Sequence, residues 1–213
     1  MVEFALCMAF LAPILAGSFS TGASLAKAIQ AGEVCRDANV LVVRGINLAH
    51  TDNQQLVVRT AQGLGMNIAG SDSPDPNGKG VIILTRVYRV SGNDCLAQGL
   101  QANSSSCPNM DNYVITNRIT IGNTSLFTSV TGTPASPLDV NGNVAASEYV
   151  INTGDRASDF PPASIMSAGG ATSGLLYLDP GNYTFVSEAT FNISDLNLFS
   201  IIQTPVLYAR NLS

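Results

Sequence analysis

Tryptophan is absent from this chain, histidine occurs once, and charged side chains are scarce. They make up 12% of the 213 residues, about half of the usual share in soluble domains. The 10 basic side chains form no cluster and are outnumbered by 15 acidic ones, giving a net charge of −5. Nucleic acid requires rows of cations that neutralise its phosphates, so we do not expect it as a partner.

Candidate catalytic groups are equally sparse. The single histidine, His50, falls at the expected end of a helix, and no serine or cysteine stands in a recognisable nucleophile motif. The cysteines show no CxxC spacing, so zinc is not indicated. Asp139, Asn141 and Asn143 offer oxygen ligands without completing a calcium loop, and an ordinary turn is the simpler interpretation. We therefore expect no enzyme, no catalytic residue, no cofactor and no metal.

One apolar run, in contrast, is unusually long. Residues 2–26 are almost uninterrupted apolar and small side chains, and the one charge among them is the carboxylate of Glu3. A helix rises about 1.5 Å per residue, so roughly 20 such residues cross a bilayer core. The run is long enough to anchor the chain in a membrane. Inside hydrocarbon, Glu3 would need a cationic partner, a neutral form or an escape to the interface.

The first 80 residues read as helical. We expect a long helix over residues 1–50, with a kink or local melting before Pro13 because proline removes one backbone hydrogen bond. After Lys27 the apolar residues recur at helical spacing, so this half can pack on a folded domain. Residues 51–80 should hold a second helix and a linker, with Thr51 and Gln54 in capping-box spacing.

Residues 81–213 carry β signals. Strands are expected at 81–90 and 113–121, the latter forming a hairpin with 126–130 across a Gly-Asn turn. Residues 183–193 should form another strand, after a turn that separates it from 175–178. The fold class predicted is therefore α+β, a long N-terminal helix and a short helix followed by an antiparallel β-rich domain.

The cysteines and one long irregular stretch allow further predictions. Cys95 and Cys107 lie 12 apart in a polar, loop-like stretch, and we expect a disulfide between them. Cys7 and Cys35 have no partner nearby in the sequence and read as small buried thiols. Residues 131–171 have little periodicity and little charge, so we expect an insertion that forms exposed, variable surface.

Several of these segments resemble one family. Residues 2–6 (VEFAL), the apolar run with its proline, and residues 35–38 and 44–45 resemble the N-terminal signature of TadE-like pilins and pseudopilins of tight-adherence (Tad/Flp-type) type IV pilus systems. Residues 183–191 and 207–210 resemble the closing strands of that family. The two matches cover about 80 residues; the middle of the chain is unmatched.

The resemblance implies a structural subunit of an extracellular filament. Such a subunit is exported as a prepilin, cut by a prepilin peptidase, held in the inner membrane at an assembly platform, and polymerised through its N-terminal helix into a homo-oligomer. Glu3 would pair with the terminal amine of a neighbouring chain and set the register. The residues expected to form the helix core and its register are Glu3, Phe4, Leu6, Leu11, Pro13, Ile14 and Leu15.

Other readings remain open at this point. The alternative hypothesis is a minor or tip-located, membrane-anchored pseudopilin or adhesin, which binds a surface or glycan through residues 131–171. A secreted protein with a signal peptide up to about residue 17 is a third reading, and the acid at Glu3 argues against it. Family precursors carry a basic leader before the glutamate, so the chain is expected to be a processed form in another register or to lack residues at its start.

Overall fold

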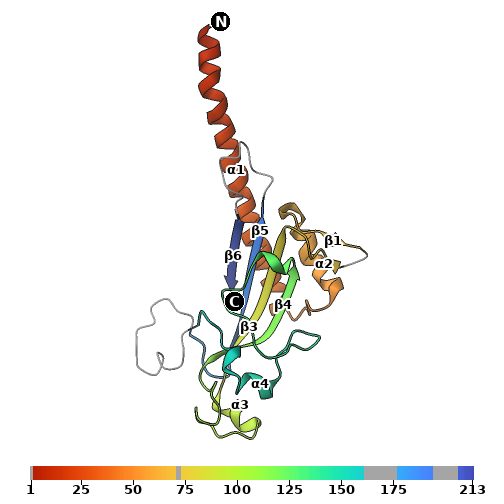
Figure 1. The fold of residues 1–213 in the computed structure, drawn as a ribbon, viewed down its shortest axis with the longest axis vertical. Helices are drawn as coiled ribbons and strands as arrows, with labels where there is room; N and C mark the ends of the chain where they lie inside the picture. The colour runs from red at the N-terminus through yellow and green to blue at the C-terminus, as the bar shows by residue number, and fades with distance from the viewer. Residues whose placement is uncertain (1, 71–72, 161–176, 194–205) are drawn as a thin grey trace.

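A single long helix, α1 (Val2–Val43), begins the chain and extends well beyond the rest of the molecule (Figure 1). The computed structural model describes residues 2–70, 73–160, 177–193 and 206–213, and of residues 2–7 the backbone alone. Helices come first and an antiparallel sheet follows, so the predicted α+β class is confirmed. The helix is continuous through Pro13, so the local melting expected before it does not occur.

The long helix ends earlier than predicted, at Val43 and not near residue 50. Gly45 has a φ of 82°, a left-handed conformation that glycine adopts at little cost. The amides of Gly45 and Ile46 donate to the carbonyls of Val42 and Leu41, at 2.9 and 3.0 Å. These two bonds form a Schellman motif, which satisfies the last carbonyls and stops the helix.

A second helix, α2 (Thr51–Thr60), follows close to its predicted place, and the single turn η1 (Gln62–Leu64) continues it. The N-cap residue is His50, and no side chain caps the helix, so the predicted capping box is wrong. Gln54 Nε2 donates instead to the carbonyl of Leu48, at 2.8 Å, and ties the helix to the loop before it. Two short paired strands, β1 (Ile68–Ala69) and β2 (Ser73–Pro74), complete this region.

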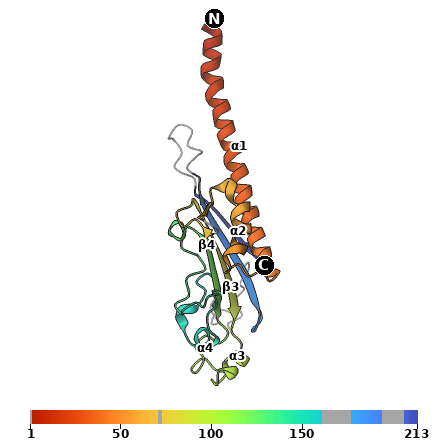
Figure 2. The same ribbon diagram turned by 90° about the vertical axis from the view of Figure 1, so that its right-hand side faces the viewer.

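The main sheet has four antiparallel strands in the order β4-β3-β5-β6. Their bounds are β3 (Gly80–Arg89), β4 (Tyr113–Gly122), β5 (Tyr183–Asn192) and β6 (Val206–Leu212). The central strand β3 is buried on both faces, which fits its run of β-branched residues. Figure 2 shows the reason, because α1 and α2 lie on one side of the sheet and irregular chain lies on the other.

The hairpin predicted for residues 126–130 is wrong, because β4 pairs with β3. After β4, the amide of Asn123 donates to the carbonyl of Gly80 at 2.9 Å, and Asn123 Oδ1 accepts from the amide of Ser125 at 3.0 Å. These bonds turn the chain into the short helix η2 (Thr124–Leu126). Val130 then donates its amide to the side chain of Glu188 on β5, so this segment crosses the far face of the sheet.

The strand predicted at residues 183–193 is found as β5, but it pairs with β3 and β6. The turn before it forms as expected, since the amide of Asn182 donates to the carbonyl of Asp179 at 3.0 Å and Gly181 has a φ of 92°. Of the stretch expected before that turn, residues 175–178, Tyr177 and Leu178 belong to no strand, and residues 175–176 lie outside the described part.

The main hydrophobic core lies between α1, α2 and the sheet. Its buried members come from each of the three predicted parts, residues 1–50, 51–80 and 81–213. The largest are Leu48, Val57, Val58, Met66, Ile82, Ile121 and Phe191. The second half of α1 contacts mainly β5 and β6. The helix and the sheet are therefore folded around one shared core.

The described part of the expected insertion, residues 131–160, packs against the sheet. It contains two short helices, α4 (Ala146–Tyr149) and η3 (Thr153–Asp155). The buried carboxylate of Asp155 accepts hydrogen bonds from the amide and hydroxyl of Ser136, at 2.8 and 2.6 Å. Residues 161–171, the rest of that prediction, lie outside the described residues.

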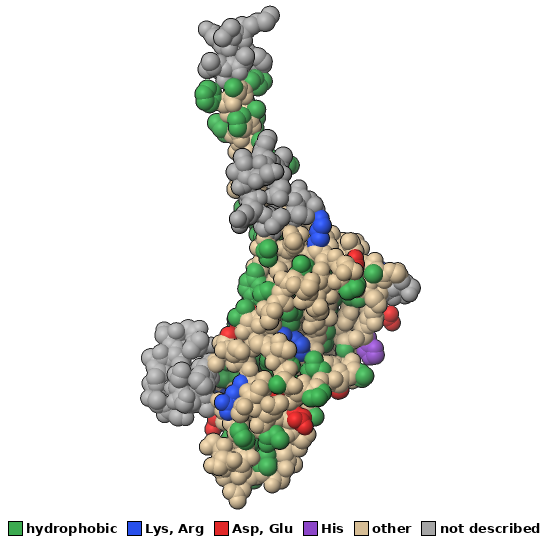
Figure 3. Space-filling view, viewed as in Figure 1, with side chains coloured by type: hydrophobic (Ala, Val, Ile, Leu, Met, Phe, Trp, Pro, Cys, Tyr) green, Lys and Arg blue, Asp and Glu red, His purple; other side chains and the backbone are tan. Residues whose placement is uncertain are grey.

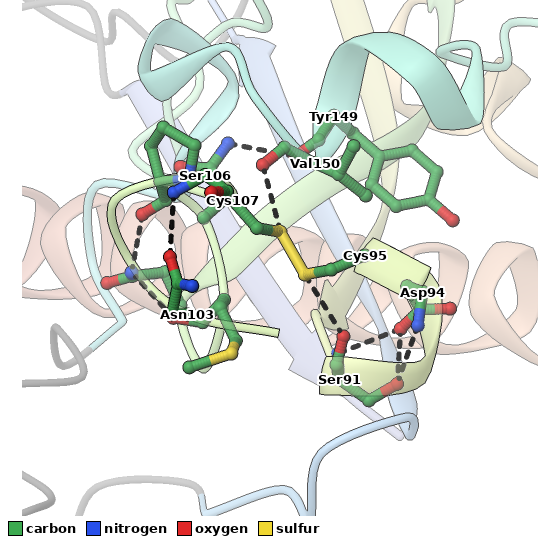
Figure 4. Close-up of a disulfide and its surroundings, with 12 residues drawn as sticks. Ser91, Asp94, Cys95, Asn103, Ser106, Cys107, Tyr149 and Val150 are labelled. Carbon is green, nitrogen blue, oxygen red and sulfur yellow. Dashed lines mark hydrogen bonds between the residues drawn. A yellow bond between two sulfur atoms is a disulfide. The ribbon is translucent and has the colours of Figure 1, made fainter. Parts of the chain in front are cut away.

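The predicted disulfide between Cys95 and Cys107 is present, and both residues are fully buried (Figure 4). Cys95 belongs to α3 (Gly92–Ala97), whose N-cap Ser91 accepts from the amide of Asp94 while Asp94 accepts from the amide of Ser91. This reciprocal capping box fixes the helix that carries Cys95. The bridge closes the loop at the end of the sheet remote from the N-terminus (Figure 1).

Candidate functional site

The described residues in the first half of α1 expose large apolar side chains to solvent. Phe10, Ile14 and Phe19 are 67%, 66% and 71% exposed. The predicted assembly residues Leu11, Pro13 and Leu15 lie in the same stretch, and each is exposed. Figure 3 shows hydrophobic side chains on a narrow stalk above the body of the molecule. An apolar surface of this size marks a site of contact with lipid or protein.

The two sides of this stretch differ in side-chain size. With about 100° between successive residues, the large residues Phe10, Leu11, Ile14, Leu15 and Phe19 fall on one half of the helix surface. The small residues Ala9, Ala12 and Ala16 fall on the other half, an arrangement that the sequence analysis missed. Small side chains let helix backbones approach closely in an apolar environment. The helix can therefore offer bulky side chains to one neighbour and a shallow face to another.

Two hydroxyl groups in this stretch are satisfied within the helix. Ser18 Oγ donates to the carbonyl of Ile14 at 2.8 Å, and Thr21 Oγ1 donates to the carbonyl of Gly17 at 2.9 Å. A hydroxyl without a partner is costly away from water, and bonding to the carbonyl four residues earlier removes that cost. These polar residues are thus compatible with a surrounding of lipid or packed helices.

The second half of α1 is covered by the sheet. Ala31, Val34, Cys35 and Ala38 are buried at helical spacing, while charged residues between them face outward. The predicted buried thiol of Cys35 is confirmed: its Sγ donates to the carbonyl of Ser187 at 3.3 Å. The side chain of Cys7 lies outside the described part.

Two further hydrogen bonds join α1 to the sheet. Ser187 Oγ donates to the carbonyl of Cys35 at 3.0 Å, which joins the helix backbone to β5. Asn39 Nδ2 donates to Asn211 Oδ1 at 2.9 Å, which joins it to the outer strand β6. Because hydrogen bonds are directional, these pairs set the position of the helix along the sheet more sharply than apolar contacts do.

Three predicted assembly residues, Glu3, Phe4 and Leu6, belong to the first turns of α1, and their side chains lie outside the described part. By length and composition, the helix from Met8 to Val43 is sufficient to cross a membrane. Of the apolar 18-residue stretch that meets this criterion, 6% is buried. A signal sequence passes the same test, whereas the core helix of a soluble protein would be mostly buried. The helix is therefore compatible with membrane anchoring.

The other candidates from the sequence occupy ordinary positions. His50 is exposed at the start of α2. Asp139 accepts hydrogen bonds from the amides of Asn141 and Asn143, both at 2.8 Å, as in a turn. The bonds from Asn143 lower the pKa of Asp139, and the bond from Asn141 adds to this. Among the described residues, no three His, Cys, Asp or Glu side chains are grouped as metal ligands would be.

A second buried carboxylate, besides that of Asp155, was not predicted from the sequence. Glu188 on β5 is fully buried and accepts from Ser129 Oγ, from the amide of Val130 at 3.0 Å and from Tyr208 Oη at 3.0 Å. Burial and the adjacent Glu188 raise the pKa of Tyr208. Burial lowers the pKa of Arg118 to about 10, and Glu188 opposes that shift. Glu188 therefore joins the segment at Ser129 and Val130 to β5, and it also links β5 to the neighbouring strand β6.

Comparison of the chain with protein-family models, with curated proteins and with solved structures finds no match. Its function is therefore inferred from its own residues and their geometry.

Proposed function

We propose that the chain is a structural subunit of an extracellular filament of the tight-adherence type IV pilus kind, polymerised through the first half of α1. The observation that carries this proposal is that residues 8–19 carry no charge and expose most of their large apolar side chains to solvent. A helix that is apolar all round is stable in water only when it is buried. Neighbouring copies of the same helix would bury it in a filament.

The magnitudes favour apolar packing as the source of cohesion. Burying on the order of 1,000 Å² per helix away from water gives roughly 25 kcal/mol before ordering costs, far more than one ion pair contributes. A subunit held in the inner membrane before assembly is already out of water, however. For that step the gain must come from close packing between helices, for which the large and small faces of α1 are suited.

The role proposed for Glu3 is to set the register between subunits. In an apolar filament core its carboxylate would pair with the terminal amine of a neighbouring chain, so that two charges are removed together. Buried ion pairs of this kind select one alignment among many that apolar packing alone would allow. A prepilin peptidase and an inner-membrane assembly platform are the other partners that this function requires.

The test replaces Glu3 in cells that produce the chain. Glu3→Ala should leave the protein in the membrane fraction but abolish filaments in electron micrographs of sheared surface material. Glu33→Ala is the matched control, because Glu33 is an exposed carboxylate on the same helix, beside the sheet. Normal filaments with Glu3→Ala would reject the register role. Absence of any filament from the unaltered chain would reject the whole proposal.

A further inference from the structure

A concave surface of about 420 Å³ lies on the α1 side of the sheet, where the helix has ended. Its floor is a row of three side chains, because Asn117, Arg86 and Phe185 are in register across β4, β3 and β5. One wall is formed at and after the helix end by Val42, Val43, Gly45, Ile46 and Asn47, and another part of the lining comes from Asn141 and Asn143. The volume is in the range of small-molecule sites.

Arg86 is the one charged side chain among the described residues that line this surface. Its Nε donates to Thr116 Oγ1 at 2.9 Å, which fixes the direction of the half-buried guanidinium. Within the described chain, the two terminal nitrogens of Arg86 have no hydrogen-bond or ion-pair partner. A guanidinium held in this way presents two parallel N–H groups, the geometry that a carboxylate matches.

The amide side chains around Arg86 hold one another in place. Asn47 Nδ2 donates to Asn141 Oδ1 at 3.0 Å, and Asn117 Nδ2 donates to the carbonyl of Asn141 and to Asn143 Oδ1, both at 2.9 Å. This network leaves Asn117 Oδ1 as an acceptor and Asn141 Nδ2 as a donor without partners among the described residues. Fixed donors and acceptors beside each other suit a ligand with several hydroxyl groups.

Two aromatic rings complete the surface. Tyr183 and Phe185 lie on the same side of β5, with ring centroids 5.4 Å apart and planes at 73°. Tyr183 is 57% exposed, so much of its surface is free to contact a ligand. An aromatic ring with a polar edge binds a ligand that is apolar on one side and polar on its rim.

We propose that this surface binds a carboxylated saccharide, such as one that contains a hexuronic acid. Arg86 takes the carboxylate, Asn117 and Asn141 take ring hydroxyls, and Tyr183 packs on the apolar face of the sugar ring. A simple anion would use Arg86 alone, and a neutral sugar would leave Arg86 unpaired. The surface shares no described residue with the first half of α1, so this inference does not rest on filament assembly.

The test titrates the full chain in detergent micelles with tetragalacturonate, a hyaluronan tetrasaccharide and sialyllactose, each against a neutral sugar of similar size, by calorimetry. At least one acidic sugar should bind about tenfold more tightly than its neutral match. Arg86→Gln should abolish that preference, and Tyr183→Ala should weaken binding of both sugars. Arg59→Gln, an exposed arginine on α2, is the control and should change neither.

Three results would overturn the proposal. One is no binding of any acidic sugar at concentrations up to about 10 mM. Another is full competition by inorganic phosphate against the acidic sugar, together with unchanged sugar binding by Tyr183→Ala. That result would indicate a simple anion site. The third is loss of filaments with Arg86→Gln without sugar binding by the unaltered chain, which indicates a contact with a second copy. Circular dichroism of each variant verifies that it is folded.

Discussion

The two halves of α1 form one continuous helix but present different surfaces. The second half buries Ala31, Val34 and Ala38 against the sheet and turns its charges outward. The described part of the first half has no charged residue and exposes bulky apolar side chains such as Ile14. Backbone hydrogen bonding is the same in both halves, so the side chains alone decide what each half can contact. One half completes a domain, and the other half requires a partner.

The largest effect should come from a charge in the second half. Val34 is buried in the core between helix and sheet. Val34→Asp would place a carboxylate there without a partner, and the free energy of unfolding should fall by more than about 3 kcal/mol. Thermal melting of the full chain in detergent, followed by circular dichroism, measures the loss. Val40→Asp on the exposed side of the same half is the control; equal losses in both would contradict the packing of α1 on the sheet.

An aspartate in the first half of α1 should abolish filaments and leave the stability of the folded body unchanged. Ile14→Asp should leave the melting temperature of the folded body unchanged. Filaments should be lost, because an aspartate at the centre of an apolar helix costs about 2.5 to 3.5 kcal/mol per copy. Electron microscopy of sheared surface material counts the filaments. Val140→Asp is the matched control, because Val140 is 92% exposed on a loop; filaments that survive Ile14→Asp would show that this half is not an assembly surface.

The disulfide should stabilise the body of the molecule and not the stalk. Replacing Cys95 and Cys107 together by serine opens a loop of sequence separation 12, and stability should fall by roughly 3 kcal/mol. The melting curve of the double variant, compared with that of the oxidised chain, gives the difference. Below the new melting temperature, filaments should still form, because the bridge is remote from the first half of α1 (Figure 1). Filament loss in the folded double variant would contradict this separation.

The smallest effect concerns the polar contact between α1 and β6. Asn39→Ala removes its hydrogen bond to Asn211, and the free energy of unfolding should fall by about 1 kcal/mol. A double-mutant cycle with Asn211→Ala isolates the pair, and the double variant should lose less than the sum of the two single changes. Strict additivity would show that the bond contributes nothing to holding the helix in place.

Local sequence patterns were sufficient for element types and insufficient for pairing. The apolar run of α1, the strand at β5 and the disulfide were all predicted because each depends on near neighbours. The hairpin after β4 was wrong because its outcome depends on Gly80 and Glu188, which are far away in sequence. The end of α1 was not predicted, although Gly45 is the residue that stops the helix. Several single glycines precede Gly45, and the sequence alone does not show which glycine adopts a left-handed conformation.

The candidate site divides in the same way. Leu11, Ile14 and Leu15 were identified from composition, but composition does not distinguish an exposed apolar helix from a buried one. That distinction depends on where the sheet ends along α1, which is a property of the whole fold. The carboxylate of Glu188 was missed because polar residues alternate with apolar ones on β5, a pattern typical of a strand with one face in water. The segment at 123–160 covers that face.

Electron cryo-microscopy of filaments sheared from cells that produce the chain tests the central claim most directly. We predict that the first halves of α1 pack against one another in the filament core, with the sheet domains outside and the Glu3 carboxylate within ion-pair distance of a neighbouring amine. A map that shows this half alone in lipid, in contact with no other copy of the chain, would contradict the account.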